Sequence, residues 1–170
     1  HRDIKPQNIF VNEAGDFKLG DFGIAKTSGH TTKATKTGTY GYMAPEVYWG
    51  RPYNATVDIY SLGLVLYWML NERRGPFLPL PPALPKSAQN AEAMERRMHG
   101  EVLPAPKNGS DALKRIVLKA CAYDPKKRYH TAEEMLADLQ AMEYGMAQPY
   151  GNGQKSAVSV PQEKSDEATS

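Results

Sequence analysis

The longest apolar stretch of the chain covers residues 59–70, where only Ser61 and Gly63 interrupt the hydrophobic side chains. The stretch is shorter than the roughly 20 residues that a membrane-spanning helix needs, so its length favours a buried helix over a truncated membrane anchor. Its apolar residues surround the helix instead of forming one stripe, which is typical of a helix enclosed on all sides. We therefore expect this helix to lie at the centre of the core.

Three later segments have the spacing of amphipathic helices. Residues 87–99 end before Gly100, a common C-terminal stop, and their expected buried face carries Ala91, Met94 and Met98. Residues 110–123 follow the N-cap Ser110 and repeat apolar residues at helical spacing: Leu113, Ile116, Val117, Ala120 and Cys121. Residues 131–143 begin with a Thr-Ala-Glu-Glu capping box, and the expected buried residues are Met135, Leu136, Leu139 and Met142.

The remaining segments predict strands, loops and a tail. Residues 8–12 and 16–20 are short β-prone runs that fit a two-stranded hairpin, and residues 28–39 have the composition of a mobile loop. Residues 76–85 are proline-rich, so we expect an extended, stiff connector, with a ligand for an aromatic-lined module as the alternative. The polar composition of residues 144–170 predicts a disordered linker.

Composition narrows the class of protein. The 170 residues include 21 Lys and Arg against 19 Asp and Glu, and 41% are hydrophobic, which is typical of one soluble globular domain. This even charge balance gives no reason to expect nucleic acid or an acidic membrane surface as a partner. The single cysteine, Cys121, excludes an internal disulfide and a multi-cysteine metal site, and no targeting segment is recognisable.

Candidate chemistry begins with the first eight residues, His-Arg-Asp-Ile-Lys-Pro-Gln-Asn. They place the carboxylate of Asp3, the amine of Lys5 and the carboxamide of Asn8 close together. Phosphoryl transfer uses such a set: an acceptor for the hydroxyl proton, a cation for the phosphoryl charge and a neutral oxygen ligand for magnesium. An ordinary polar surface turn is the alternative for this segment taken alone.

A second motif, Asp21-Phe22-Gly23, follows the predicted hairpin and precedes the predicted loop. Its carboxylate can hold a divalent metal, its aromatic ring can pack inward and its glycine permits a change of backbone conformation. The tripeptide is common by chance, but its position after Asn8 and across a hairpin makes the combination specific.

With Ala44-Pro45-Glu46 added, residues 1–143 resemble the large lobe of eukaryotic-type protein kinases. The motifs occur in order, and the further matches are Gly38-Thr39, Asp58 and Arg128. The resemblance implies an α+β fold, a mainly helical large lobe with a short hairpin that carries the catalytic and metal-binding loops.

The resemblance also implies roles for individual residues. Asp3 would orient and deprotonate the substrate hydroxyl, and Lys5 would neutralise the transferring phosphoryl group. Asn8 and Asp21 would hold the Mg²⁺ ions that bridge the phosphates of ATP. The positions of His1 and Phe22 match a structural hydrophobic stack, and a second stack beneath the adenine, mostly core packing, would contain Phe10, Val65 and Met69.

Other matched residues imply support of the catalytic segment. Asp58 would accept hydrogen bonds from the backbone around His1 and Arg2, and Thr39 would contact Asp3 and Lys5. Glu46 and Arg128 would form a buried ion pair that fixes the end of the activation loop. Packing roles are expected for Tyr40 and Tyr42.

The Lys5-Pro6 sequence and the segment from Gly38 to Met43 resemble kinases that act on serine and threonine, so Ser/Thr hydroxyls of proteins are the expected substrates. A phosphate in the loop before Gly38 could pair with Arg2 and order the loop. The preferred site is Thr35, with Thr37, Thr32 and Thr31 as further candidates. A loop that is merely flexible is the alternative.

The sequence departs from the family in one respect: it has no Gly-rich phosphate loop, no strand lysine and no partner glutamate helix. We therefore expect a large-lobe fragment, inactive by itself, of a kinase whose small lobe precedes His1. A non-catalytic scaffold and a small-molecule phosphotransferase are the alternatives. The form of the connector and tail resembles bacterial relatives, so the expected location is the cytoplasm, including the cytoplasmic part of a membrane-anchored kinase.

Overall fold

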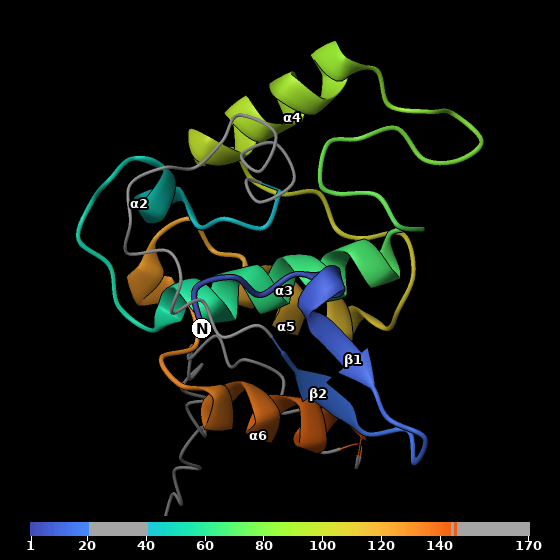
Figure 1. The fold of residues 1–170 in the computed structure, drawn as a ribbon, viewed down its shortest axis with the longest axis vertical. Helices are drawn as coiled ribbons and strands as arrows, with labels where there is room; N and C mark the ends of the chain where they lie inside the picture. Colours follow the sequence, from blue (N-terminus) through green and yellow to red (C-terminus); the bar gives the residue numbers. More distant parts are fainter. Residues whose placement is uncertain (21–40, 144, 146–170) are drawn as a thin grey trace, which may run out of the picture.

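The computed structural model describes residues 1–20, 41–143 and 145, and within them helices dominate while one small sheet lies at the side (Figure 1). The elements in chain order are the 3₁₀ turn η1 (Pro6–Asn8), strands β1 (Ile9–Val11) and β2 (Phe17–Leu19), helices α2 (Pro45–Tyr48), α3 (Thr56–Leu70), α4 (Ser87–Met98) and α5 (Asp111–Ala120), the 3₁₀ turn η3 (Pro125–Lys127) and helix α6 (Ala132–Glu143). The expected mainly helical content with a short hairpin is confirmed. The loop expected over residues 28–39 and, apart from Gly145, the tail expected over residues 144–170 lie outside the described residues.

Helix α3 lies at the centre and packs against α5 (Figure 1). The two helices approach closely at Gly63, where an added Cβ atom would lie 2.8 Å from the Cys121 sulfur and 2.9 Å from the Ala120 Cβ. Most of α3 is buried, as its all-round apolar pattern predicts, and the expected buried helix is confirmed. Its enclosure ends before Met69, whose side chain is 57% exposed.

Helices α5 and α6 begin at their expected caps. The Ser110 hydroxyl accepts a hydrogen bond from the Leu113 N–H, and the Thr131 hydroxyl accepts one from the Glu134 N–H, both at 3.2 Å. Helix α6 buries Met135, but the expectation that Leu136 is buried is wrong, because that side chain is 52% exposed. Only one narrow side of α6 packs on α5. Leu136, the residue after the buried Met135, therefore faces solvent.

Helix α4 stands apart from the α3–α5 pair and lies over α2 (Figure 1). Its buried face consists of Ala93, Arg97 and Met98. The expected position of Met98 is confirmed, but Ala91 is exposed. The buried face is centred on the i, i+4 pair Ala93 and Arg97, because Arg97 reaches from α4 to the chain before α2.

The proline-rich connector between α3 and α4 is not extended, so that part of the prediction is wrong. The Leu78 N–H bonds to the Gly75 carbonyl and the Ala83 N–H to the Leu80 carbonyl, and each bond closes a turn. Phe77 has a left-handed φ of +66°. Proline fixes only its own φ and lacks only its own N–H, so the residues between the prolines remain able to close turns.

The hairpin is antiparallel, with Ile9 opposite Leu19 and Val11 opposite Phe17, as predicted. Its apolar side chains are exposed: 55% for Phe10, 58% for Val11 and 71% for Phe17. The expectation of core packing therefore fails for Phe10 as it does for Met69, while Val65 is buried. The Phe10 ring lies on Gly20, where an added Cβ would be 2.6 Å from the ring.

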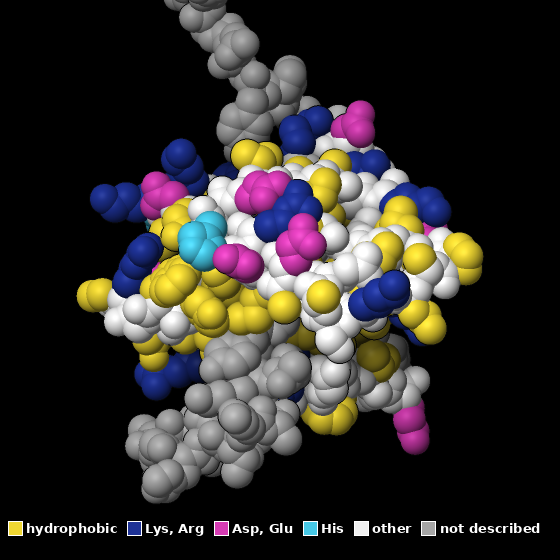
Figure 2. Space-filling view, turned by 90° about the horizontal axis from the view of Figure 1, so that it is seen from above, with side chains coloured by type: hydrophobic (Ala, Val, Ile, Leu, Met, Phe, Trp, Pro, Cys, Tyr) yellow, Lys and Arg dark blue, Asp and Glu magenta, His cyan; other side chains and the backbone are white. Residues whose placement is uncertain are grey.

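The surface above α4 carries basic and acidic side chains interspersed with hydrophobic ones (Figure 2). Neither sign of charge dominates the described part of this face. Within residues 1–20, 41–143 and 145, no helix combines the length and the apolar character needed to cross a bilayer.

Candidate active site

The structure brings together three of the predicted site residues, Asp3, Lys5 and Asn8. The Lys5 Nζ atom lies 3.0 Å from Oδ2 of Asp3, whose side chain is 7% exposed. The Asn8 Nδ2 group donates hydrogen bonds to the Asp3 backbone carbonyl at 2.8 Å and to Asp3 Oδ2 at 3.1 Å. A buried carboxylate is thus held between an ammonium and an amide.

The turn η1 explains how residues five positions apart meet. Pro6 occupies the first position of the turn, where its missing N–H removes no hydrogen bond. The Asn8 N–H then bonds to the Lys5 carbonyl at 2.9 Å. The turn directs the Asn8 side chain back toward Asp3 and buries it.

Asn8 has the chemistry of a magnesium ligand. Nδ2 donates both hydrogen bonds of the side chain. The carbonyl oxygen Oδ1 therefore remains available as a hard, neutral metal ligand of the kind that Mg²⁺ prefers. The described residues contain no cluster of three or more His, Cys, Asp and Glu side chains that could hold a metal ion alone. The second predicted ligand, Asp21, lies outside the described residues.

Residues 1–8, which carry the candidate catalytic residues Asp3, Lys5 and Asn8, are called the catalytic segment below. Asp58, in the first turn of α3, anchors the start of this segment. Its Oδ1 accepts a hydrogen bond from the Arg2 N–H at 2.8 Å, and its Oδ2 accepts one from the His1 amino nitrogen at 2.8 Å. Arg2 has a left-handed φ of +69°, which costs a non-glycine residue free energy and recurs at functional sites. The contacts are those that the resemblance implied for Asp58.

The imidazole of His1 joins the catalytic segment to the end of β2. Nδ1 accepts from the Asp3 N–H at 3.3 Å, and Nε2 lies 2.9 Å from the Gly20 carbonyl, so the tautomer protonated at Nε2 satisfies both contacts. The Gly20 N–H also bonds to the Asn8 carbonyl at 2.9 Å. These contacts fit a structural role for His1, and they fix Gly20 beside Asn8.

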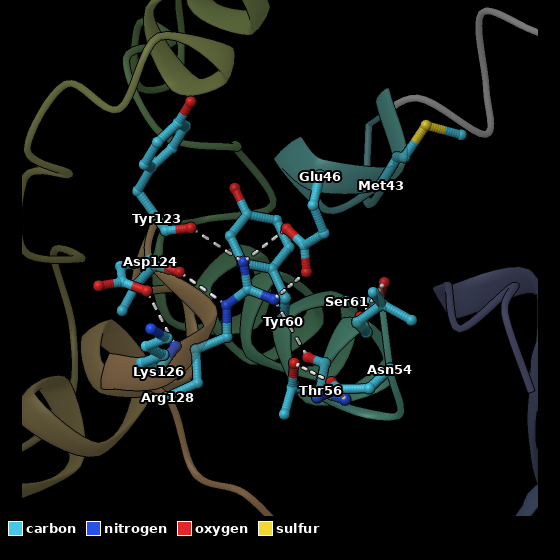
Figure 3. Close-up of polar contacts among 12 residues, drawn as sticks. Met43, Glu46, Asn54, Thr56, Tyr60, Ser61, Tyr123, Asp124, Lys126 and Arg128 are labelled. Atoms are coloured by element: carbon cyan, nitrogen blue, oxygen red, sulfur yellow. Dashed lines mark hydrogen bonds and ion pairs between the residues drawn. The ribbon is translucent and has the colours of Figure 1, made fainter. Parts of the chain in front are cut away.

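Glu46 and Arg128 form a buried, two-pronged ion pair, shown in Figure 3. The distances are 2.6 Å from Nη1 to Oε1 and 2.8 Å from Nη2 to Oε2. The guanidinium also donates to the backbone carbonyls of Thr56, Ala122 and Tyr123. Because all three nitrogens have acceptors, the pair joins α2, α3 and the chain after α5 without leaving a polar group unsatisfied.

Tyr60 and Arg97 belong to the same region and escaped the sequence reasoning. Arg97 donates to the Met43 carbonyl at 2.8 Å and to the Tyr60 hydroxyl at 3.2 Å, and the Arg128 guanidinium lies 4.6 Å from the centre of the Tyr60 ring. Burial raises the pKa of Tyr60, although the positive charge of Arg97 opposes that shift. No sequence signal marked Arg97, because the face of this helix expected to be buried contained Ala91, Met94 and Met98 and not Arg97.

Ten of the residues singled out in the sequence lie outside the described residues: Asp21, Phe22, Gly23, Thr31, Thr32, Thr35, Thr37, Gly38, Thr39 and Tyr40. Tyr42 is half-buried and packs against the core cluster around α3, which is the packing expected of it. Burial raises the pKa of the Tyr42 phenol. The contact expected between Thr39 and Asp3 stays a prediction.

Comparison with known proteins finds a match to the protein kinase domain family over residues 1–139. A probable serine/threonine-protein kinase of Corynebacterium efficiens is 37% identical over 149 residues, which cover 84% of this chain and 22% of that protein. The serine/threonine-protein kinase PknB of Mycolicibacterium smegmatis is 38% identical over 155 residues, 86% of this chain and 23% of the relative. For PrkC of Bacillus subtilis, also a serine/threonine-protein kinase, the identity is 34% over 147 residues, 82% of this chain and 21% of the relative. The chain therefore spans about a fifth of the length of these curated relatives.

Proposed function

The chain belongs to the protein kinase domain family, and on this premise we propose that it carries the catalytic residues of a protein serine/threonine kinase. Such an enzyme transfers the γ-phosphate of ATP to serine or threonine hydroxyls of proteins. The observation that carries the proposal is the cluster of Asp3, Lys5 and Asn8, in which a buried carboxylate contacts both a cation and an amide.

Each member of the cluster has a role that follows from its chemistry. The Asp3 carboxylate orients the substrate hydroxyl and accepts its proton at an Oδ atom. The Lys5 ammonium, 3.0 Å from that carboxylate, lies where it can stabilise the negative charge of the transferring phosphoryl group. In phosphoryl transfer, most of the catalysis comes from such positioning and electrostatic stabilisation.

Asn8 and Asp21 are the residues we assign to magnesium. Bound Mg²⁺ would neutralise charge on the phosphates of ATP. The Asn8 carbonyl oxygen is a suitable donor, and Gly20, the residue before Asp21, is hydrogen-bonded to both Asn8 and His1. That attachment of Gly20 supports the assignment, because Asp21 follows Gly20 directly in the sequence.

Serine and threonine are the proposed acceptors because the Lys5-Pro6 sequence and the segment from Gly38 to Met43 resemble kinases of that class. The three relatives compared above are serine/threonine-protein kinases, or probable ones, by name, which agrees with this choice. We also retain Thr35 as the proposed site of activating phosphorylation, followed by Thr37, Thr32 and Thr31. The cytoplasm is the proposed compartment, since ATP is the proposed donor.

We assign residues 1–143 to the large lobe of the kinase and residues 144–170 to a linker. The exposed apolar hairpin supports the assignment: Val11 and Phe17, which are paired across the two strands, are both more than half exposed, and neighbouring apolar side chains on a surface mark a site of contact. A small lobe that supplies the Gly-rich loop would cover them. The isolated chain is therefore expected to bind Mg-ATP weakly, and micromolar binding in calorimetry would contradict the assignment.

The proposed function is tested with the complete gene product that carries this chain, incubated with Mg-ATP and peptides that differ only in Thr, Ser or Tyr as acceptor. We expect phosphate on the Thr and Ser peptides and little on Tyr. No transfer to any peptide, with ATP bound, would favour the non-catalytic scaffold. Transfer to small hydroxyl compounds alone would favour a small-molecule phosphotransferase.

A further inference from the structure

A cavity of about 750 Å³ lies between the end of α3, the connector and α4. Figure 1 shows the connector leaving the end of α3 and looping outward before α4 begins. Apolar side chains form part of its wall, among them Trp68, Leu78 and Met94. The cavity has the size of a ligand site.

The charged residues of its wall are all of one sign. Arg73, Arg74 and Arg97 line the cavity, and none of the described residues of its wall is Asp or Glu. The first residues of α4 add Ser87 and Asn90, near the positive end of the helix dipole. We call this cavity the arginine pocket.

Arg74 is hydrogen-bonded to backbone carbonyls but has no carboxylate partner among the described residues. Its Nη1 and Nη2 groups donate to the backbone carbonyls of Arg73 and Ala83, but its Nε–H is buried without an acceptor. Neither Arg73 nor Arg74 forms an ion pair within residues 1–20, 41–143 and 145. The wall therefore carries positive charge that the described residues do not neutralise, and an anionic side chain in the cavity would pair with it at the accessible guanidinium groups.

The turn that presents the two arginines is fixed in advance. Asn71, which is buried, donates to the Arg74 carbonyl at 3.2 Å and accepts from the Lys107 N–H at 3.0 Å. Glu72 and Arg73 have left-handed φ values of +51° and +59°. Non-glycine residues keep such conformations where the surroundings impose them, and binding sites are a frequent place for them.

Tyr42 connects the arginine pocket with the catalytic segment. It lines the arginine pocket and also a smaller cavity whose wall includes Arg2, Asp3 and Asp58. An extended polypeptide with its hydroxyl at Asp3 can therefore continue past Tyr42 toward Arg73 and Arg74. This continuity argues for a polypeptide over a free small anion.

We propose that the arginine pocket binds an acidic side chain, flanked by an apolar residue, of the protein substrate whose hydroxyl is at Asp3. The acidic group pairs with Arg73 and Arg74, and the apolar neighbour packs against Trp68 and Met94. The inference rests on the proposed function for the identity of the ligand as a substrate. It adds a specificity determinant outside the catalytic cluster.

The binding test needs no catalysis. A fluorescent peptide with one Thr, one Glu and an adjacent Leu is titrated with the 170-residue chain, and anisotropy reports the dissociation constant. Replacing Glu by Gln in the peptide, or Arg73→Gln in the chain, should weaken binding about tenfold, the loss of one charge-assisted contact. Arg73 is exposed, so its replacement leaves the fold intact, whereas Arg74 also holds the Ala83 carbonyl.

Arg115→Gln is the matched control, because Arg115 is exposed on α5 and absent from the wall of the pocket. It removes the same charge and should leave peptide binding unchanged. Equal affinity for the Glu and Gln peptides, or equal loss in Arg73→Gln and Arg115→Gln, would overturn the proposal. Displacement of the peptide by an equal concentration of inorganic phosphate would also overturn it, since the pocket would then be a small-anion site.

A second assay separates this inference from the proposed function. The complete gene product is given the two peptides and Mg-ATP, and kcat/KM is compared. A preference for the Glu peptide that Arg73→Gln abolishes supports the proposal. Equal phosphorylation of both peptides contradicts it while the kinase function stands, and arginine-dependent binding without any phosphorylation contradicts the function and leaves the pocket as an acidic-peptide site.

Discussion

The Asp58 carboxylate accepts a hydrogen bond from the Arg2 N–H at 2.8 Å, and Arg2 has a φ of +69°. A residue of the central helix thus holds the backbone immediately before Asp3 in a conformation that it would otherwise leave. The geometry of the cluster of Asp3, Lys5 and Asn8 therefore depends on α3.

Removing the Asp58 carboxylate tests this dependence. Asp58→Ala leaves the Arg2 N–H without its acceptor, and we expect a loss of about 1–3 kcal/mol in the free energy of unfolding. Urea denaturation of the chain measures it. Asp16→Ala on the exposed hairpin is the control, and an equal, small change in both variants would contradict the anchoring role.

Substitutions of Arg2 test the strained backbone itself. Arg2→Gly should be close to neutral, because relief of about 1–2 kcal/mol of left-handed strain is offset by the greater entropy loss of glycine. Arg2→Val should destabilise the chain, since a β-branched residue tolerates positive φ poorly. If unfolding curves give Arg2→Val a free energy of unfolding equal to or higher than that of Arg2→Gly, Arg2 is unstrained.

The buried ion pair predicts a large effect for Glu46→Ala. Arg128 is 2% exposed and would be left as an uncompensated buried charge, so the free energy of unfolding should fall by roughly 3–5 kcal/mol. The exposed pair Arg96–Glu101 supplies the control, because Glu101→Ala removes an ion pair that solvent screens. Similar melting temperatures for Glu46→Ala and the parent chain would refute the assigned role.

The close approach of α3 and α5 predicts that Gly63→Ala destabilises the chain, even though alanine is the better helix former. The new methyl group would lie 2.8 Å from the Cys121 sulfur and 2.9 Å from the Ala120 Cβ, and overpacking of this kind costs about 1–3 kcal/mol. Cys121→Ala in the same chain should restore part of the loss. A Gly63→Ala chain that is more stable than its parent would mean that the helices separate freely.

Burial raises the pKa of the Cys121 thiol to about 12. An unfolded thiol ionises near pH 8.5, so above that pH the unfolded chain releases a proton that the folded chain keeps. The ionisation of this thiol therefore leaves the free energy of unfolding unchanged below about pH 8.5. Above that pH it lowers the free energy of unfolding, by about 2 kcal/mol at pH 10. Urea midpoints at pH 7.5 and 10 measure the change, which should be smaller in Cys121→Ala, and an equal drop in both chains would contradict the assignment.

The elements were predictable where one local pattern decides them. The Ser110 and Thr131 caps, the all-round apolar helix and the hairpin depend on residues near each other in sequence, and the structure has them. Leu136 and Ala91 were misplaced because helical periodicity does not say how wide a buried face is. The connector failed because a count of prolines does not show which of the intervening N–H groups close turns.

For the site, the pattern of the first eight residues indicated Asp3, Lys5 and Asn8, and the resemblance to protein kinases implied the pair Glu46 and Arg128. The structure brings each of these two groups together. The contacts of Arg97 were not predictable, because its acceptor, the Met43 carbonyl, is 54 positions away and backbone carbonyls leave no sign in a sequence. The arginine pocket was likewise not predictable from the sequence. It exists only because the end of α3 and the start of α4 meet.

The central claim, that this chain carries the catalytic carboxylate of a protein kinase, is tested most directly by Asp3→Asn in the complete gene product. The measurement is the rate of phosphate transfer from Mg-ATP to a Thr peptide, beside Asp16→Asn as a matched exposed carboxylate. We predict a fall of about 10²–10⁴-fold for Asp3→Asn, the usual contribution of a positioned acid or base, and an unchanged rate for Asp16→Asn. An Asp3→Asn enzyme that transfers phosphate at the parent rate would contradict the account.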